Sequence, residues 1–307
     1  MSFLYINPGT ADLLDVAGTT VENPKYNPFG GISFWQDTVD RKSCTTLPEI
    51  PSELYMKFCL YLKGASAYAT VYAGNNTGCS VSCSSGTWRF TVTSSNSQVC
   101  NRTAPEAGLK VSGMNDILFH ARYGYYSAGY ISVIVNGTEV YTANTTVDFN
   151  QKSTGNVPSD GIVFYSRNED ALLSNIIVSD APVAWNEKVA VLAAKSTDTD
   201  MADNGDGSYT ASAAGQYLFQ SLDADALIGT YGEASPVTGV FLAGNPAYCT
   251  GAELTKAIAC GRKDGIVTEY GTAALGTDRN AHALIGSRLS LTLADLRGRE
   301  FGWKAGV

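Results

Sequence analysis

The stretch GYISVIVNGTEVYT, residues 129–142, decides the fold class of this sequence. Short runs in which apolar residues alternate with others stand on both sides of the dipeptide Asn136-Gly137. Asn-Gly supplies the two positive φ angles that a two-residue hairpin turn requires, and alternation is typical of a strand with one buried face. The stretch therefore predicts an antiparallel β-hairpin.

Further runs of the same kind surround the hairpin. Each holds β-branched or aromatic residues and is bounded by Gly, Pro, Asn, Asp or Ser. Alternation is clearest where Trp88, Phe90 and Val92 share one face. Many short strands with no long helical pattern between them predict a β-sandwich. The predicted strands are 31–40, 53–64, 67–74, 87–95, 116–126, 129–137, 138–147, 161–168 and 172–180.

The texture of the sequence changes after the segment SDAPVAWNEK, in which Pro182 ends the last of these strands. This junction divides the chain into domains of residues 1–184 and 185–307. In the second domain, candidate N-caps and closing glycines predict short helices between strands, so we expect a smaller α+β domain. The predicted helices are 221–229, 250–261 and 292–298, and the predicted strands are 188–195, 207–215, 216–222, 236–244, 265–271 and 288–293.

Charge and hydropathy exclude several classes of function. The net charge is −8, from 21 Lys and Arg against 29 Asp and Glu, and no run of basic residues occurs. A phosphate backbone would require clustered cations, so nucleic acid is not an expected partner. The N-terminus lacks a basic segment followed by a long apolar one, and no later run approaches a membrane span in length. We therefore expect synthesis in a host cytoplasm and no membrane insertion.

The seven cysteines do not form a recognised metal motif. Their number is odd, so at least one is unpaired, and without a secretory signal we expect reduced thiols. Cys79 and Cys83, followed by Cys100, have a spacing that suits zinc, but no fourth ligand lies nearby in sequence.

The first domain carries a resemblance in the segments DILFHARYGYYSAGYISVIVNGTEVYTA (116–143) and GIVFYSRNEDALLSNIIVSD (161–180), above all in the phrase LSNIIVSD (173–180). These residues resemble the laminin-G/concanavalin-like jelly-roll family. The resemblance implies a concanavalin-like jelly-roll β-sandwich over residues 1–184. Members of the family often bind glycans or proteins, and the fold alone does not imply catalysis.

Calcium is the only cofactor that these patterns leave open, because the jelly roll often carries a structural calcium ion near its rim. Loop carboxylates, amides and carbonyls would be its ligands. Position in the sequence singles out Asp37, Asp40, Asn168 and Asp170. The acidic segment DTDMADNGDG (198–207) departs from a helix-loop-helix calcium loop, and a strand, a turn at NGDG and a second strand is the better interpretation.

The second domain contains TDTDMADNGDGSYTASAAGQYLFQSLD (197–223) and ends in TLADLRGREFGWKAGV (292–307). These stretches resemble a C-terminal module of virion and tail proteins of tailed bacteriophages and prophages, which serves assembly or attachment. The resemblance implies a virion location and other virion proteins as partners. If the protein is an adhesin, weak single sites would need multivalency, so we expect a homo-oligomer, and a trimer by analogy with phage fibres.

The tyrosine-rich segment RYGYYSAGY is the candidate binding site. Sugar rings stack on aromatic side chains, while hydroxyl, guanidinium and amide groups bond sugar hydroxyls. A Gly-rich bend directs some of these tyrosines away from the core. The alternative is that they cap the sandwich edge or form a subunit contact, where Tyr is also common. The candidate residues are Arg122, Tyr123, Tyr125, Tyr126 and Tyr130, together with Trp35.

Catalytic motifs are absent from the sequence. The two histidines, His120 and His282, are interpreted as a sheet residue and a loop residue, and no nucleophile, zinc or phosphate-loop motif accompanies them. Glycoside hydrolysis needs two carboxylates across a cleft, and Glu49 with Glu53 has a suitable spacing in a stretch that Pro48 and Pro51 make turn-like.

The sequence thus predicts a non-enzymatic bacteriophage virion protein, of tail, fibre or adhesin type, whose jelly roll binds a glycan or another component of the host surface. Two alternatives stay open. One is a capsid decoration or assembly protein with no ligand, and the other is a polysaccharide depolymerase.

Overall fold

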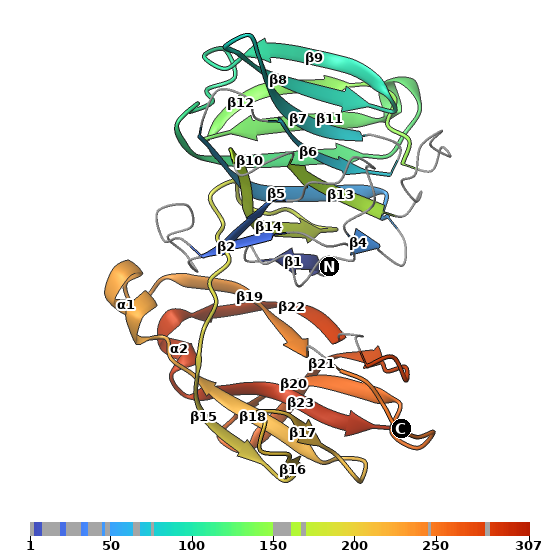
Figure 1. Cartoon of the computed structure of the whole chain (residues 1–307), viewed down its shortest axis with the longest axis vertical. Coiled ribbons are helices and arrows are strands. Elements are labelled where there is room, and N and C mark those ends of the chain that lie inside the picture. Colours follow the sequence, from blue (N-terminus) through green and yellow to red (C-terminus); the bar gives the residue numbers. More distant parts are fainter. Residues whose placement is uncertain are drawn as a thin grey trace. The chain divides into compact units, whose positions relative to one another are not determined.

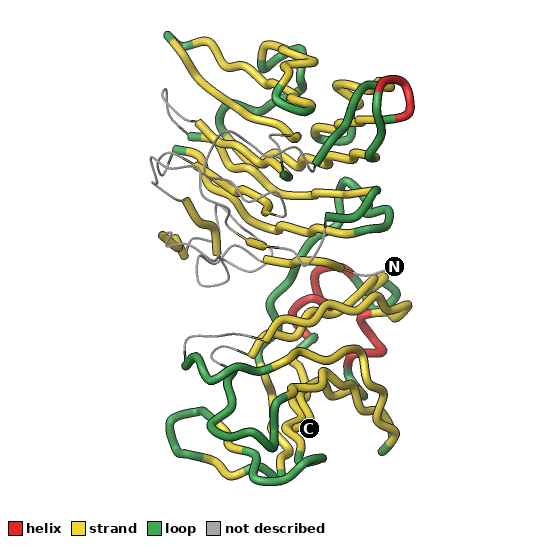
Figure 2. Tube along the Cα trace, turned by 90° about the vertical axis from the view of Figure 1, so that its right-hand side faces the viewer, coloured by secondary structure: helices red, strands yellow, loops and turns green. Residues whose placement is uncertain are grey.

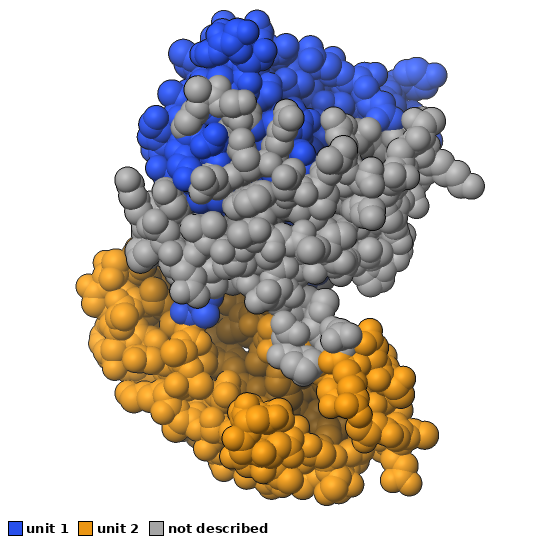
Figure 3. Space-filling model, in the orientation of Figure 1, with its two compact units in different colours: residues 1, 3–191 blue, residues 2, 192–307 orange. Residues whose placement is uncertain are grey.

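The computed structural model describes two compact units, residues 3–191 and 192–307 (Figure 3). The sequence predicts the division between residues 184 and 185. Only the backbone is described for residues 19–22, 32–35 and 45–46 and for Leu284. The described residues are 3–7, 19–22, 32–35, 45–46, 50–63, 68–74, 77–149, 161–166, 170–244, 247–279 and 283–307.

The first unit is a jelly-roll β-sandwich of two antiparallel sheets (Figure 1). In the eight-stranded sheet the order is β12-β11-β10-β5-β14-β3-β2, and β1 also pairs with β14; the six-stranded sheet has the order β4-β13-β6-β7-β8-β9. The strands of the first sheet are β1 (Phe3–Asn7), β2 (Thr19–Glu22), β3 (Ile32–Trp35), β5 (Glu53–Leu62), β10 (Gly113–Arg122), β11 (Tyr130–Val135), β12 (Thr138–Asn144) and β14 (Ala171–Ser179). The strands of the second are β4 (Thr45–Thr46), β6 (Tyr68–Ala73), β7 (Thr77–Ser84), β8 (Thr87–Ser94), β9 (Ser97–Thr103) and β13 (Gly161–Ser166).

The core of this unit lies between the two sheets. Alternate residues of β5, β8, β10 and β11 point inward, and Phe119 of β10 and Phe90 of β8 are completely buried there. Trp88 and Val92 are buried beside Phe90, as their alternation predicts. The Asn136-Gly137 turn has φ angles of +51° and +83°, which confirms the hairpin between β11 and β12.

The other residues of the first sheet point to its outer face. Along β10 they include Asp116, His120 and Arg122, and the register places His120 opposite Tyr55 of β5. The connecting segment lies against the same face, because Val189 donates its backbone N–H to Asn175 of β14 at 2.9 Å. The outer face therefore carries titratable groups of β10 and its neighbours.

The second unit consists of small sheets and two short helices, shown in Figure 2 as mostly strand. Its five-stranded sheet has the order β15-β18-β23-β20-β21, and two hairpins, β16-β17 and β19-β22, accompany it. The five strands are β15 (Ala194–Thr199), β18 (Tyr217–Leu222), β20 (Lys256–Lys263), β21 (Ile266–Ala274) and β23 (Arg299–Gly306). The remaining elements are β16 (Ala202–Asp203), β17 (Tyr209–Thr210), β19 (Pro236–Gly244), β22 (Ala283–Thr292), α1 (Asp225–Tyr231) and α2 (Leu293–Leu296).

Helix α2 follows the predicted capping chemistry. The side chain of Thr292 accepts the backbone N–H of Asp295, and the Asp295 carboxylate accepts the backbone N–H of Thr292. Leu293 and Leu296 then pack with Phe301 in a small core. The reciprocal cap explains why so short a helix begins where the sequence predicts it.

The helix predicted at 250–261 is wrong, because residues Lys256–Lys263 form β20. This strand pairs with β21 on one side and β23 on the other, and Ala259 and Cys260 are completely buried in it. Two-sided pairing outweighs the local helical pattern. The strand predicted at 188–195 is also displaced, since β15 begins at Ala194.

The predicted fold class is confirmed: the chain is mainly β, with a sandwich followed by a smaller unit that holds the two α-helices. The segment NGDG is the turn between β16 and β17, as predicted. Among the described residues, no helix has the length and apolarity needed to cross a bilayer.

Candidate functional site

The tyrosine-rich segment connects β10 to β11. We call residues 123–129 the tyrosine loop; it contains a 3-10 turn, η2 (Tyr126–Ala128). The loop follows Arg122, the last residue of β10, and precedes Tyr130, the first residue of β11. It therefore lies at the end of the first sheet where β5 and β11 begin.

The backbone of the tyrosine loop is anchored to residues 145–147. Gly124 and Val147 exchange both backbone hydrogen bonds, at 3.0 and 2.8 Å, and Thr145 donates to Gly129 at 3.0 Å. The backbone N–H of Tyr126 donates a hydrogen bond of 2.9 Å to the side-chain oxygen Oγ1 of Thr146. These bonds fix the loop before any ligand arrives.

Two glycines permit this close approach. A Cβ on Gly129 would lie 2.1 Å from the carbonyl oxygen of Thr145, and a Cβ on Gly124 would lie 2.5 Å from backbone atoms of Ala128 and Gly129. Real Cβ atoms do not approach so closely, so both positions require glycine.

The anchored loop presents its tyrosines to solvent. Tyr126 is 84% exposed on a backbone with φ of +54°, a conformation that bulky residues seldom adopt. Tyr125 is 52% exposed and its ring meets that of Tyr123 edge to face, with centroids 5.7 Å apart. A strained backbone that displays an aromatic ring is a recurrent feature of binding sites.

The hydroxyl of Tyr125 is hydrogen-bonded to the buried carboxylate of Asp148. This hydroxyl donates to Asp148 Oδ2 at 3.0 Å, and Asp148 itself is 2% exposed. Hydrogen bonds to Tyr123 and Asp148 raise the pKa of Tyr125 to about 12. The Asp148 backbone N–H donates to Ser95 Oγ at 2.9 Å, so a turn of the second sheet supports the loop.

A second group of side chains lies on the outer face of the first sheet next to the loop. We call Glu53, Tyr55, His120, Arg122 and Tyr130 the His120 cluster. Nε2 of His120 lies 2.9 Å from Glu53 Oε1, which also accepts the Tyr55 hydroxyl at 3.1 Å. The rings of His120 and Tyr55 stack at 4.1 Å and 5°. On the other side, the ring of Tyr130 lies 5.3 Å from His120.

Burial governs the protonation of this cluster. It lowers the pKa of His120, against the opposing effect of Glu53, and it raises the pKa of Tyr55 to about 12. His120 is therefore neutral at pH 7, and the Glu53 carboxylate assigns the ring proton to Nε2. Nδ1 is left as a basic nitrogen, so the cluster has the chemistry for hydrogen bonding and for proton transfer.

The structure divides the predicted site residues into two adjoining groups. Tyr123, Tyr125 and Tyr126 belong to the loop, whereas Arg122 and Tyr130 lie on the sheet face. Trp35 is the last residue of β3, separated from β10 by β14 and β5, and its side chain lies outside the described residues.

Three partners of the site were not singled out from the sequence. Pro48 and Pro51 predict a turn next to Glu53, and Tyr55 and Asp148 carry no motif. Only the pairing of β5 with β10 shows that Glu53 and Tyr55 flank His120, 67 positions from Glu53. Strand alternation would have placed His120 and Arg122 on one face.

Metal ligands do not gather in the described part of the chain. Within it, no three His, Cys, Asp or Glu side chains are arranged to hold an ion. Of the calcium candidates, Asp37, Asp40 and Asn168 lie outside the described residues, and Asp170 accepts the backbone N–H of Lys63 through its carbonyl oxygen.

The candidate zinc ligands occupy a sheet. The structure places Cys79 in the core, where burial raises its pKa, and Cys83 in the same strand. Cys100 lies across β8 in β9. The cysteines that the structure describes are free thiols: Cys59, Cys79, Cys83, Cys100, Cys249 and Cys260.

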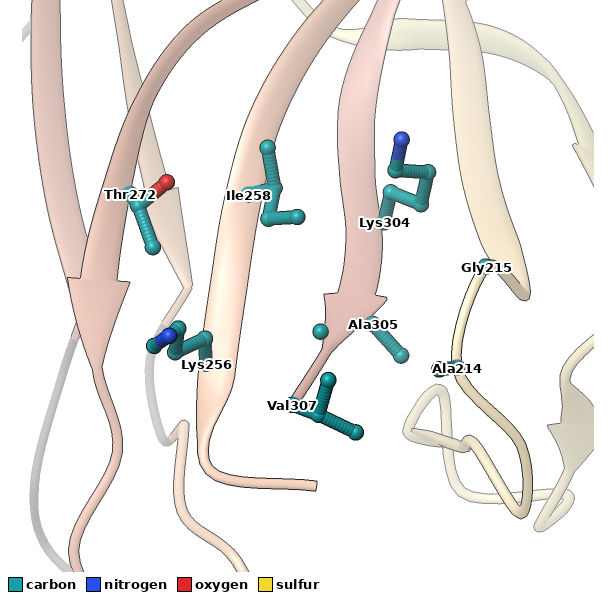
Figure 4. A pocket seen from close by; sticks show the side chains of 9 residues that line it. Ala214, Gly215, Lys256, Ile258, Thr272, Lys304, Ala305 and Val307 are labelled. Atoms are coloured by element: carbon teal, nitrogen blue, oxygen red, sulfur yellow. The ribbon is translucent and has the colours of Figure 1, made fainter. Parts of the chain in front are cut away.

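The second unit has an open pocket of about 670 Å³ at one end of its five-stranded sheet (Figure 4). Ile258, Thr272 and Lys304 line it from three neighbouring strands. The Lys304 ammonium forms an ion pair with Glu269. Lys256, the other lysine that lines the pocket, does not share that carboxylate. Mostly apolar walls and one such lysine specify no ligand class.

Comparison with solved structures finds distant likenesses. An endo-beta-1,4-glucuronan lyase from the fungus Trichoderma reesei has a TM-score of 0.37 and 11% identity, over 58% of this chain and 96% of that chain. Sheep galectin-11 has a TM-score of 0.29 and 12% sequence identity, over 44% of this chain and 95% of that chain. The receptor-binding domain of botulinum neurotoxin type G has a TM-score of 0.33 and 9% sequence identity, over 100% of this chain and 98% of that chain. Likenesses this distant do not assign a function.

No protein-family model matches the chain, and no curated protein sequence matches it either.

Proposed function

We propose that the first unit binds a glycan through the tyrosine loop and that the protein is a non-enzymatic surface component of a virion. The observation that carries the binding proposal is Tyr126. Its ring is 84% exposed, and its backbone is held at a φ of +54° by the anchored loop. An exposed ring on a restrained backbone loses little entropy when a ligand covers it.

Sugars suit the chemistry of this surface. The C–H face of a pyranose stacks on an aromatic ring, and Tyr125 and Tyr126 each offer one with half or more of the residue exposed. The Tyr125 hydroxyl is already bonded to Asp148, so that residue contributes its ring face. Polar groups of the adjoining His120 cluster can bond the sugar hydroxyls.

The substitution Tyr126→Ala tests the location of the site. Among the described contacts its side chain has no hydrogen-bond partner, so the variant should fold normally and raise the glycan Kd about tenfold, or ~1.4 kcal/mol. Tyr126→Trp should retain affinity because a stacking ring remains. Tyr231→Ala, an exposed tyrosine of the second unit, is the control. Equal titration curves for Tyr126→Ala and the wild-type protein would place the site elsewhere.

Glycan cleavage is the alternative, and the pairing of His120 with Glu53 at 2.9 Å favours it. A neutral imidazole held by a carboxylate can accept a proton during bond breaking. A depolymerase would release new reducing ends from a polysaccharide, and His120→Gln would stop the release without stopping binding. Detecting such release from the wild-type chain would overturn the non-enzymatic proposal.

Assembly is proposed for the second unit on the basis of its resemblance to tailed-phage modules. One structural feature supports it: β21 lies at the edge of its sheet, with Ile266 72% and Val267 44% exposed. Such an edge suits pairing with another virion subunit or another copy. Several weak glycan sites would then act together. A monomer in light scattering that stays monomeric at high concentration would argue against self-assembly.

A further inference from the structure

Arg122 presents an exposed positive charge at the candidate site. Within the described ranges, its guanidinium makes no ion pair with a carboxylate, and its residue is exposed. By contrast, Arg262 and Arg297 of the second unit each hold two carboxylates.

The acid opposite Arg122 in the strand register forms no ion pair with it. Glu53 is its partner across β5, on the same outer face. However, Glu53 Oε1 is engaged by Nε2 of His120 and by the hydroxyl of Tyr55. Among the described residues no ion pair joins Glu53 to Arg122, so the N–H donors of the guanidinium remain available, although the Glu53 charge lies on the same face.

The surroundings of Arg122 orient its hydrogen-bond donors. The guanidinium carbon lies 5.8 Å from the centre of the Tyr130 ring, a cation–π distance that keeps the side chain over the aromatic face. The next residue in the chain is Tyr123, the first residue of the tyrosine loop. The free cation and the exposed rings thus occupy adjoining parts of one surface.

We propose that the glycan bound at the tyrosine loop is an acidic one, and that Arg122 receives its carboxylate. The inference rests on the proposed function and specifies its ligand class. A planar guanidinium matches a carboxylate with two parallel N–H donors. One guanidinium balances one carboxylate, whereas a phosphate dianion would leave a negative charge facing Glu53.

Long-range electrostatics oppose this preference and set the conditions for the test. The net charge of −8 repels an acidic polymer at low ionic strength. At about 0.15 M salt the screening length is roughly 8 Å, so remote charges fade while the direct Arg122 contact persists. Binding should therefore be measured at physiological salt.

The test uses the full-length protein on an array of neutral, carboxylate-bearing and sulfated glycans. The proposal expects binding to carboxylate-bearing members. The best of them is then titrated beside its carboxyl-reduced form, which should bind about 10- to 100-fold more weakly. Arg122→Gln should bind both forms equally and weakly. Arg89→Gln, an exposed arginine of β8 on the second sheet, should behave as the wild-type protein.

Three results would overturn the proposal, and they are distinguishable. Equal affinity of the wild-type protein for the acidic and carboxyl-reduced forms, with dependence on Tyr126, refutes the carboxylate but leaves glycan binding in place. Exclusive binding of neutral or sulfated glycans does the same. No binding to any glycan refutes the acidic ligand and the proposed function together. Near-ultraviolet circular dichroism confirms that Arg122→Gln is folded.

Discussion

Lys57 is completely buried on the outer face of the first sheet, where its ammonium group lies 3.1 Å from Asp116 and 3.2 Å from the thiol of Cys59. Lys188, from the connecting segment, bonds the same carboxylate. Burial by itself raises the pKa of Asp116, but the two ammonium groups outweigh it and hold that pKa below its ordinary value. One carboxylate therefore compensates two cations.

Asp116→Asn should consequently destabilise the first unit. Removing one partner of a buried ion pair typically costs about 3–5 kcal/mol, because the remaining charge is left without compensation. Lys57→Met, which replaces the buried cation with an apolar chain of similar length, should cost less. Urea unfolding of both variants measures the difference. If Asp116→Asn unfolds at the same urea concentration as the wild-type protein, the cluster contributes nothing to stability.

His120 makes stability depend on pH. Its folded pKa lies below the ordinary value of about 6.5, so the unfolded chain binds more protons in the interval between the two values. Stability from this residue is complete above that interval and is lost as the pH falls through it. The free energy of unfolding should decrease from pH 7 to pH 5, and less so in His120→Gln. Identical pH slopes would show that His120 titrates normally.

At the scale of elements, the sequence predicted the turns and helix caps that are specified by a few neighbouring residues. The Asn136-Gly137 hairpin and the α2 cap at Thr292 are examples, because turn and cap preferences act within a few residues. Strands β7 and β9 were missed because Ser, Cys, Thr and Asn predominate in them and favour no strand by themselves. Both strands form because each pairs with β8, one on either side of it, and their composition alone does not favour a strand.

The candidate site was predicted only in part, for a related reason. The tyrosines are visible in the sequence, but the group that holds Tyr125, Asp148, lies 23 residues away and carries no motif. Glu53 and His120 meet only because β5 and β10 are neighbours. Contacts of this kind depend on sheet order, which a single sequence does not contain.

Gly129→Ala tests whether the tyrosine loop acts as one preformed element. The added Cβ would lie 2.1 Å from the Thr145 carbonyl oxygen, so the loop must move away from residues 145–147. Glycan affinity should fall about as far as in Tyr126→Ala, although every tyrosine is retained. Gly276→Ala, where a Cβ meets nothing within 4 Å, is the control. Full affinity in Gly129→Ala would mean that the backbone of the loop is irrelevant.

At the scale of the whole molecule, the described residues of each unit include a hydrophobic core of that unit's own. Phe119 is completely buried in the core of the sandwich, and Phe301 is 4% exposed in that of the second unit. The described core clusters share no residue. Each unit therefore has what it needs to unfold as its own cooperative transition.

Calorimetry of the full chain should show this division. Phe119→Ala and Phe301→Ala should each cost about 3–5 kcal/mol from the cavity left behind, and each should lower the temperature of a different transition. If both substitutions shift one shared transition equally, the two cores are coupled and the chain unfolds as a single body.

The most direct test of the account is a glycan array probed with the folded, full-length protein at physiological salt. The account predicts binding to a defined set of glycans that bear carboxylates, and an about tenfold weakening of that binding in Tyr126→Ala but not in Tyr231→Ala. A silent array from a protein whose fold and oligomeric state are verified would contradict it, and the exposed tyrosines would then be a packing surface between subunits.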